Sequence, residues 1–89
     1  MISIRRVSKF QADYKRCLKR GCNIDLLHAI IGSLADGKRL ASRYKDHPLQ
    51  GEFKDCRECH IQPDWLLIYM LTNSELVLVR TGTHSDLFE

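Results

Sequence analysis

The second half of the chain holds three strand-like segments that follow one another with only short turns between them. Residues 52–61, 65–72 and 75–82 are rich in apolar, β-branched and aromatic residues, and turn-forming residues occupy 62–64 and 72–74. Connections this short join antiparallel neighbours, because a parallel pair needs a long crossover. The pattern therefore predicts an antiparallel meander, one face of which has to be buried by another layer.

The first half of the chain supplies that layer. Residues 2–7 have the alternation of a strand. Apolar residues then recur at helical spacing between Ser8 and Gly21 and again between Asn23 and Gly37, and each glycine is a typical helix stop. We therefore expect two helices on one face of the sheet.

Residues 37–51 show neither period and contain Pro48, so we expect a long ordered loop there. The tail that follows the last strand is short, and Thr83 can cap a single helical turn in it. At 89 residues the chain is long enough for one small domain, residues 1–89. The expected fold is an α+β two-layer domain in β-α-α-β-β-β order, with a mainly antiparallel sheet and its second face open.

The net charge of +3 conceals an uneven distribution. The first 45 residues carry 11 Lys or Arg and 3 Asp or Glu, whereas the remaining residues carry 3 and 8. Such asymmetry favours a basic surface that meets a polyanion, nucleic acid above all. Two solvated helix faces would give the same count, so this alternative stays open.

Residues 56–60 read Cys-Arg-Glu-Cys-His, the C-x-x-C-H pattern of c-type haem attachment. That chemistry belongs to exported proteins, and the N-terminal residues lack the apolar core of a signal peptide. Side chains three apart on a strand point to opposite faces, so Cys56 and Cys59 are not expected to share a ligand. We expect reduced cysteines in a cytoplasmic protein without a cofactor. A zinc site that adds Cys17 and Cys22 is the alternative.

Three of the four histidines can meet at one surface of the sheet. His60 ends one predicted strand, His84 follows a neighbouring strand, and His47 lies in the long loop. Asp64 lies across a turn from His60, and Arg80 adds a cation near the end of the last strand. His28 lies within the second helix beside its apolar residues, so we expect it to be structural.

Several imidazoles with a carboxylate and an arginine suit the cleavage of RNA by its own 2′-hydroxyl. That reaction needs a general base, a general acid and cations for the charge that gathers on phosphorus. Histidine can fill either proton-transfer role near neutral pH. The same histidines and aspartate could instead bind zinc in a metallohydrolase, or the domain could be a binding module without catalysis.

Three segments, "YKDHPLQG", "CRECHIQPDWLLIYML" and "LVRTGTHSDLF", resemble the YafQ branch of the RelE-type toxins. These are ribosome-dependent mRNA interferases of bacterial type II toxin–antitoxin pairs. The resemblance is strongest over residues 44–88 and implies a RelE-like fold and metal-free endoribonuclease activity that inhibits translation.

The resemblance also assigns residues. It implies that His47, His60, Asp64 and His84 are catalytic and that Arg80 binds the scissile phosphate. Contacts to mRNA are implied for Phe88, Trp65 and, more weakly, Glu58, although Trp65 fits the core equally well.

The resemblance implies an operon-encoded antitoxin as partner, mRNA and the ribosome as targets, operator DNA reached only through the antitoxin, and no membrane. No apolar run approaches the roughly 18 residues of a membrane span. Basic residues of the first half suit ribosomal RNA, an acidic antitoxin segment or both: Lys9, Lys15, Arg16, Lys19, Arg20, Lys38, Arg39 and Arg43.

Overall fold

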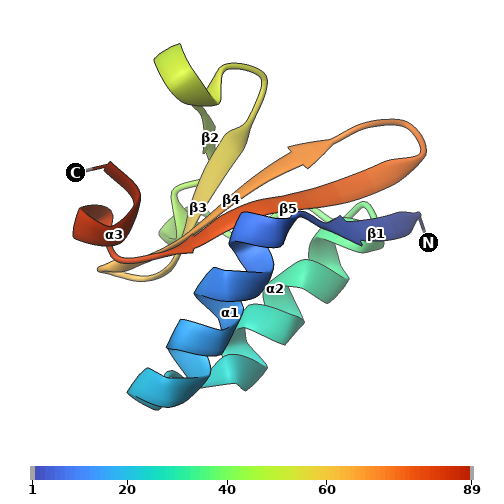
Figure 1. Ribbon diagram of the computed structural model, residues 1–89. Helices are drawn as coiled ribbons and strands as arrows, with labels where there is room; N and C mark the ends of the chain where they lie inside the picture. The colour runs from blue at the N-terminus through green and yellow to red at the C-terminus, as the bar shows by residue number, and fades with distance from the viewer. Residues whose placement is uncertain (1, 89) are drawn as a thin grey trace.

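The computed structural model describes residues 2–88. The chain forms, in order, β1 (Ser3–Arg6), α1 (Ser8–Arg20), α2 (Ile24–Ala35), the 3₁₀ turn η1 (Ser42–Tyr44), β2 (His47–Pro48), the 3₁₀ turn η2 (Gly51–Phe53), β3 (Arg57–Gln62), β4 (Trp65–Leu71), β5 (Glu75–Gly82) and α3 (His84–Phe88) (Figure 1). The α+β class and the expected order of the main elements are confirmed, and the structure adds the short strand β2. Within the described residues, no helix is both long enough and apolar enough to cross a membrane.

The strands form one sheet in the order β1-β5-β4-β3-β2. Strands β2 to β5 pair as antiparallel neighbours, which confirms the meander, and β1 adds a parallel edge to β5. The order brings β1, from the start of the chain, beside the last strand, so that α1 begins next to β5.

Helices α1 and α2 lie side by side on one face of the sheet, as expected (Figure 1). Phe10 of α1 and Leu27 and Ile31 of α2 are buried against Leu67 and Tyr69 of β4. Burial of each such side chain contributes roughly 1.5–3 kcal/mol. This core fixes α1 firmly to the sheet, which matters for the site described below.

Two glycines end these helices. Gly21 follows α1 with φ 77° and donates its N–H to carbonyls of the last turn, and Gly37 follows α2 with φ 76°. Both conformations are left-handed, where glycine carries no steric penalty. The helix stops expected from the sequence are therefore confirmed.

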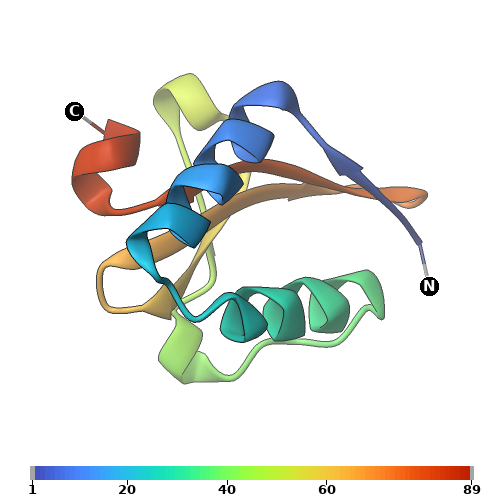
Figure 2. The same cartoon turned by 60° about the horizontal axis from the view of Figure 1, so that its bottom comes forward.

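The second face of the sheet is not open, contrary to expectation. Leu66 and Ile68 of β4 are fully buried there in a smaller cluster with Leu87 of α3, and Leu49 and Phe53 pack against this cluster from the loop. Figure 2 shows η2 and α3 on the side of the sheet opposite to α2. The cover comes from a loop and a single helical turn that carry little periodic signal, so no sequence pattern indicated it.

The strand expected at residues 52–61 is shorter than predicted and begins at Arg57. Gly51 has φ 69° and Asp55 has φ 74°, both outside the extended region of a strand. The backbone N–H of Leu49 donates to the carbonyl of Cys56, which closes residues 49–56 into a compact loop. The ordered loop expected over residues 37–51 also contains a short strand, because His47 and Pro48 pair with β3 as β2.

Candidate active site

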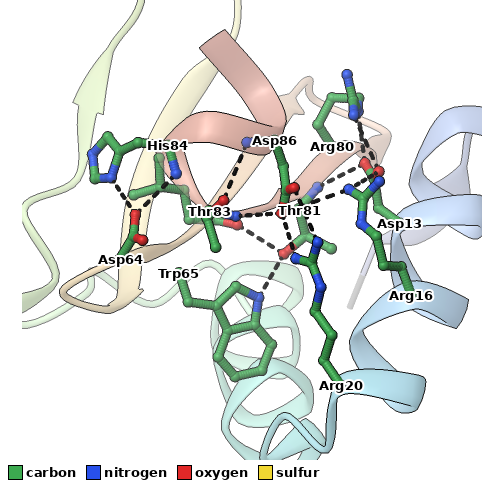
Figure 3. Close-up of polar contacts among 11 residues, drawn as sticks. Asp13, Arg16, Arg20, Asp64, Trp65, Arg80, Thr81, Thr83, His84 and Asp86 are labelled. Carbon is green, nitrogen blue, oxygen red and sulfur yellow. Dashed lines mark hydrogen bonds and ion pairs between the residues drawn. The ribbon is translucent and has the colours of Figure 1, made fainter. Parts of the chain in front are cut away.

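His84 and Asp64 form a hydrogen-bonded pair where the β3–β4 turn meets the start of α3 (Figure 3). Oδ1 of Asp64 lies 2.6 Å from Nδ1 of His84 and 2.9 Å from its backbone nitrogen. The hydrogen bond from the His84 backbone, followed by the one from its ring, holds the pKa of the Asp64 carboxyl below its usual value of 3.8. A charged carboxylate at Nδ1 selects the ring tautomer that donates from Nδ1, so Nε2 is the nitrogen left for proton transfer.

A second group surrounds Glu58 on β3. Its Oε2 lies 2.9 Å from Nε2 of His47 and 3.7 Å from Nε2 of His60. The Glu58 side chain is only 7% exposed, and its Oε1 is buried without a hydrogen-bond partner among the described residues. A carboxylate this deeply buried needs compensating groups, and the two imidazoles lie in position to provide them.

The two groups form one site. The rings of His60 and His84 meet edge to face, with their centroids 5.8 Å apart. The structure therefore brings together all four residues predicted as catalytic, and it places Glu58, expected only as a weak mRNA contact, between His47 and His60.

The loop that carries His47 is anchored by its neighbour Asp46. The Asp46 carboxylate accepts hydrogen bonds from Arg57 at 2.6 Å and from the Tyr69 hydroxyl. Nδ1 of His47 lies 3.1 Å from the carbonyl of Pro48, so both of its ring nitrogens face acceptors. Only a doubly protonated ring donates to both at once. The His47 ring is thus held between the Glu58 carboxylate and the Pro48 carbonyl.

Arg80 lies on the same side of the sheet as Glu58, because both pair across to Ile68 of β4. Its guanidinium is held by Asp13 of α1, with Nε 2.6 Å from Oδ2 and NH2 3.1 Å from Oδ1. The Asp13 hydrogen bonds raise the pKa of Arg80 above its usual value. Arg80 is therefore a permanent, oriented cation, as a phosphate contact requires.

The two aromatic candidates lie in different environments. Trp65 is 5% exposed and donates from Nε1 to the Thr81 hydroxyl at 3.0 Å, so of the two roles expected for it the structure gives it the core position. Phe88 is 48% exposed and touches Phe53 edge to face, with ring centroids 5.9 Å apart. Phe88 is the aromatic side chain that a splayed base could reach.

The basic residues of the first half do not form one uniform patch. Arg16 and Arg20 are already bound to carboxylates, whereas the lysines of α1, Lys9, Lys15 and Lys19, are exposed. Lys38 and Arg39 are exposed beyond α2, and Arg43 lies in η1. Arg43 and Lys45 line a surface groove of about 380 Å³ that reaches His60. Positive charge therefore extends along one approach to the site.

His47, Glu58 and His60 also offer one ligand atom each within 4.8 Å of one another. Two imidazole nitrogens and a carboxylate oxygen suit zinc or copper. Among the described residues the cysteines form no such group, and Cys56 and Cys59 belong to opposite cores, as expected from their spacing. Burial raises the pKa of the Cys59 thiol to about 12, which keeps it protonated and a poor ligand.

Two residues near the site gave no sequence signal. Asp13 lies inside a basic helix and belongs to no motif, and Asp46 lies within the segment "YKDHPLQG", where only its neighbour His47 is assigned a role. An acidic residue on the buried side of an amphipathic helix is the one hint that Asp13 offers. The remaining histidine, His28, lies on α2, where its Nε2 is 2.8 Å from the Tyr14 hydroxyl.

The chain is similar to several known proteins over nearly its whole length. The family described as "Bacterial toxin of type II toxin-antitoxin system, YafQ" matches residues 2–89. The mRNA interferase toxin YafQ of Escherichia coli strain K12 is 42% identical over 81 residues, which are 90% of this chain and 88% of that protein. A chain in a crystal structure of the E. coli DinJ-YafQ complex matches with TM-score 0.93 and 39% identity over 100% of both chains. A crystal structure of a metal-bound toxin from Helicobacter pylori matches with TM-score 0.92 and 47% identity, over 99% of this chain and 100% of that one.

Proposed function

The chain belongs to the YafQ family of toxins from bacterial type II toxin–antitoxin systems, and from that premise we propose that it cleaves mRNA by metal-free acid–base chemistry around His84. It is the toxin of such a system and an mRNA interferase, the activity for which its curated relatives are named. The observation that carries the proposed chemistry is the pairing of His84 with Asp64 beside the imidazole of His60.

In the proposed reaction the 2′-hydroxyl of the scissile nucleotide attacks the adjacent phosphorus. His60 takes the hydroxyl proton, and the Glu58 carboxylate behind it stabilises the imidazolium that forms. The bond from O2′ to phosphorus forms while the bond from phosphorus to O5′ breaks. His84 donates the proton on Nε2 to the departing O5′, leaving a 2′,3′-cyclic phosphate and a 5′-hydroxyl.

Asp64 acts through His84 in this scheme and does not touch the RNA. Its charge at Nδ1 orients the ring and stabilises the protonated form that serves as the acid. The base in this scheme is therefore His60, supported by the Glu58 carboxylate.

Cations beside the phosphate stabilise the charge that develops during the attack. His47 and Arg80 are proposed for this task, since each is fixed by a carboxylate and neither depends on solvent for its orientation. Phe88 is proposed to stack on a base, and Arg43 to guide the strand toward His60.

The partners follow from the family. The E. coli relative forms a complex with the antitoxin DinJ, and we propose a corresponding antitoxin for this toxin, encoded in the same operon. The ribosome and its mRNA are the targets, which places the proposed site of action in the cytoplasm.

The test is cleavage of mRNA on programmed ribosomes by the wild type, by His84→Ala and by Asp25→Asn, an exposed carboxylate on α2. We expect cuts within translated codons, with the rate reduced about 10²- to 10⁴-fold in His84→Ala and unchanged in Asp25→Asn. If the wild type cleaves mRNA and His84→Ala cleaves it at the same rate, the proposed site is contradicted. No cleavage by the wild type would contradict the activity and favour a binding module.

Metal-dependent hydrolysis is a second candidate, because His47, Glu58 and His60 form a ligand set and one relative is described as metal-bound. Those three residues would hold the ion, which would supply Lewis acidity. Loss of cleavage in a chelator and recovery on adding zinc would favour this candidate over the metal-free reaction.

A further inference from the structure

An alternating chain of charges links α1 to the end of the sheet. Asp13, Arg16 and Arg20 are spaced three and four residues apart, so they share one face of α1. That face meets Arg80 of β5 and Asp86 of α3 (Figure 3).

The contacts run without a break from one end of this network to the other. Arg80 binds Asp13 at 2.6 Å, and NH2 of Arg16 lies 2.8 Å from Oδ1 of Asp13 and 3.8 Å from Oδ2 of Asp86. Arg20 then binds both Asp86 oxygens, with NH1 2.7 Å from Oδ2 and NH2 3.2 Å from Oδ1. Every cation in the network has a carboxylate neighbour.

Asp86 controls where α3 lies. Helix α3 has five residues, and His84 and Asp86 are two positions apart on it. The Asp86 carboxylate also accepts the backbone N–H of Thr83 at 2.9 Å, while its own N–H donates to the Thr83 hydroxyl at 3.1 Å. A single turn this short has little stability of its own. The Arg20 fork therefore fixes the turn that carries His84.

Asp13 fixes the position of Arg80 in a similar way. Its side chain is 3% exposed, and besides binding Arg80 it accepts the backbone N–H of Thr81 at 3.2 Å, near the end of β5. The carboxylate thus sets both the guanidinium and the strand position from which it projects.

We propose that α1 is a positioning element for catalysis, in which Asp13 orients Arg80 and Arg20, through Asp86, orients His84. The inference deepens the proposed function and rests on it, because it gives Asp13, Arg20 and Asp86 roles in placing groups that touch the RNA. It also assigns Arg20 a different role from the nucleic-acid contact that its charge suggests.

The test compares Arg20→Ala with Arg5→Ala in the ribosome assay. Arg5 is the matched control, since it forms an exposed ion pair with Glu75 at 3.2 Å, away from the site. Misplacement of a reacting group by about 1 Å can cost around 10²-fold, so we expect Arg20→Ala to lower kcat by about 10- to 100-fold with KM nearly unchanged. Arg5→Ala should keep the wild-type kcat, and Arg20→Lys should recover part of the loss.

Two further measurements separate positioning from folding and from RNA binding. Thermal unfolding should show Arg20→Ala still fully folded at the assay temperature, although its midpoint falls because the ion pair with Asp86 is lost, while the ¹⁵N resonances of the His84 ring shift in Arg20→Ala and not in Arg5→Ala. An active wild type with full kcat and unshifted His84 resonances in Arg20→Ala would overturn the positioning role and leave the proposed function standing. A change confined to KM would also overturn it and return Arg20 to RNA binding. An inactive wild type would overturn both.

Discussion

At the scale of single residues, the hydrogen bond between Asp64 and Nδ1 of His84 decides which nitrogen of that ring exchanges protons. The carboxylate is exposed, so its effect on the ring comes mainly from orientation and tautomer choice rather than from a strong field. Removing the charge without removing the shape isolates that effect.

We therefore expect Asp64→Asn to lower kcat for mRNA cleavage by about 10²- to 10⁴-fold, because an amide can present its N–H₂ group to Nδ1 and favour the wrong tautomer. KM should change little. The measurement is single-turnover cleavage on programmed ribosomes, with Asp25→Asn as the control. Equal rates for the two variants would remove Asp64 from the mechanism.

The two aromatic residues should separate stability from RNA binding. Trp65→Ala should lower the free energy of unfolding by about 3–5 kcal/mol, since it empties a packed core site. Phe88→Ala should leave stability nearly unchanged but weaken RNA binding by about 1–3 kcal/mol. Chemical denaturation and RNA affinity measured side by side check both, and Phe88→Ala with wild-type affinity would exclude stacking.

The sequence identified the histidines that are candidates for proton transfer, but it did not identify most of the carboxylates that hold the site residues in position. His47, His60 and His84 stood out because imidazoles at strand ends and in a loop have few structural reasons to recur there. Asp13 did not, because its partners Arg80 and Thr81 are far away in the sequence and no local pattern connects them.

At the scale of elements, the junction between β5 and α3 is the tightest point in the architecture of the site. Gly82 has φ 156°, and a Cβ atom there would lie 2.8 Å from Oδ2 of Asp86 and 3.0 Å from its Cβ. The close approach lets the Asp86 carboxylate reach Arg20 and the Thr83 backbone together.

Gly82→Ala should therefore displace α3 and reduce cleavage strongly, because Asp86 has to move and His84 moves with it. Gly32→Ala is the matched control, since a Cβ at Gly32 meets no atom within 4 Å. We expect a crystal structure of Gly82→Ala to show His84 separated from Asp64. Wild-type activity in this variant would indicate that the position of α3 tolerates change.

The main elements were predictable because their hydrophobic periods are long and unbroken. The failures came at residues 49–56 and at β2, where two residues of positive φ and a two-residue strand replace a regular pattern. The cover on the second sheet face was missed for the same reason, since Leu49, Phe53 and Leu87 come from short segments that no periodicity identifies.

At the scale of the whole molecule, acid should weaken the fold through its paired carboxylates. Hydrogen bonds to Arg20 hold the pKa of Asp86 far below its usual 3.8, and those to His84 lower the pKa of Asp64. A depressed folded pKa gives stability that is present above the unfolded value and is lost as pH falls through the folded value.

We expect the free energy of unfolding to fall as pH drops below about 4, with a smaller fall in Asp86→Asn, which lacks the main titrating group. Denaturant titrations between pH 7 and pH 2 measure the slope of the unfolding free energy against pH for the wild type and for Asp86→Asn. Equal slopes for the wild type and Asp86→Asn would contradict the role of this ion pair in the fold.

Salt should act on RNA binding rather than on the chemical step. Contacts from Arg43 and the exposed lysines to phosphates release counterions. The logarithm of the RNA-binding constant should therefore fall linearly with the logarithm of salt concentration. Arg43→Ala should reduce that slope by roughly 0.7 while kcat at saturating RNA stays unchanged. An unaltered slope would place the RNA path elsewhere.

The central claim is that the RNA supplies its own nucleophile and the protein supplies only proton transfer and charge. Its most direct test is a ribosome-bound mRNA with a single 2′-deoxy nucleotide at the mapped cut site, compared with the all-ribose mRNA in the presence of a metal chelator. The account predicts cleavage of the ribose form alone, with 2′,3′-cyclic phosphate and 5′-hydroxyl ends. Cleavage of the deoxy form, or 5′-phosphate ends that vanish in the chelator, would contradict it.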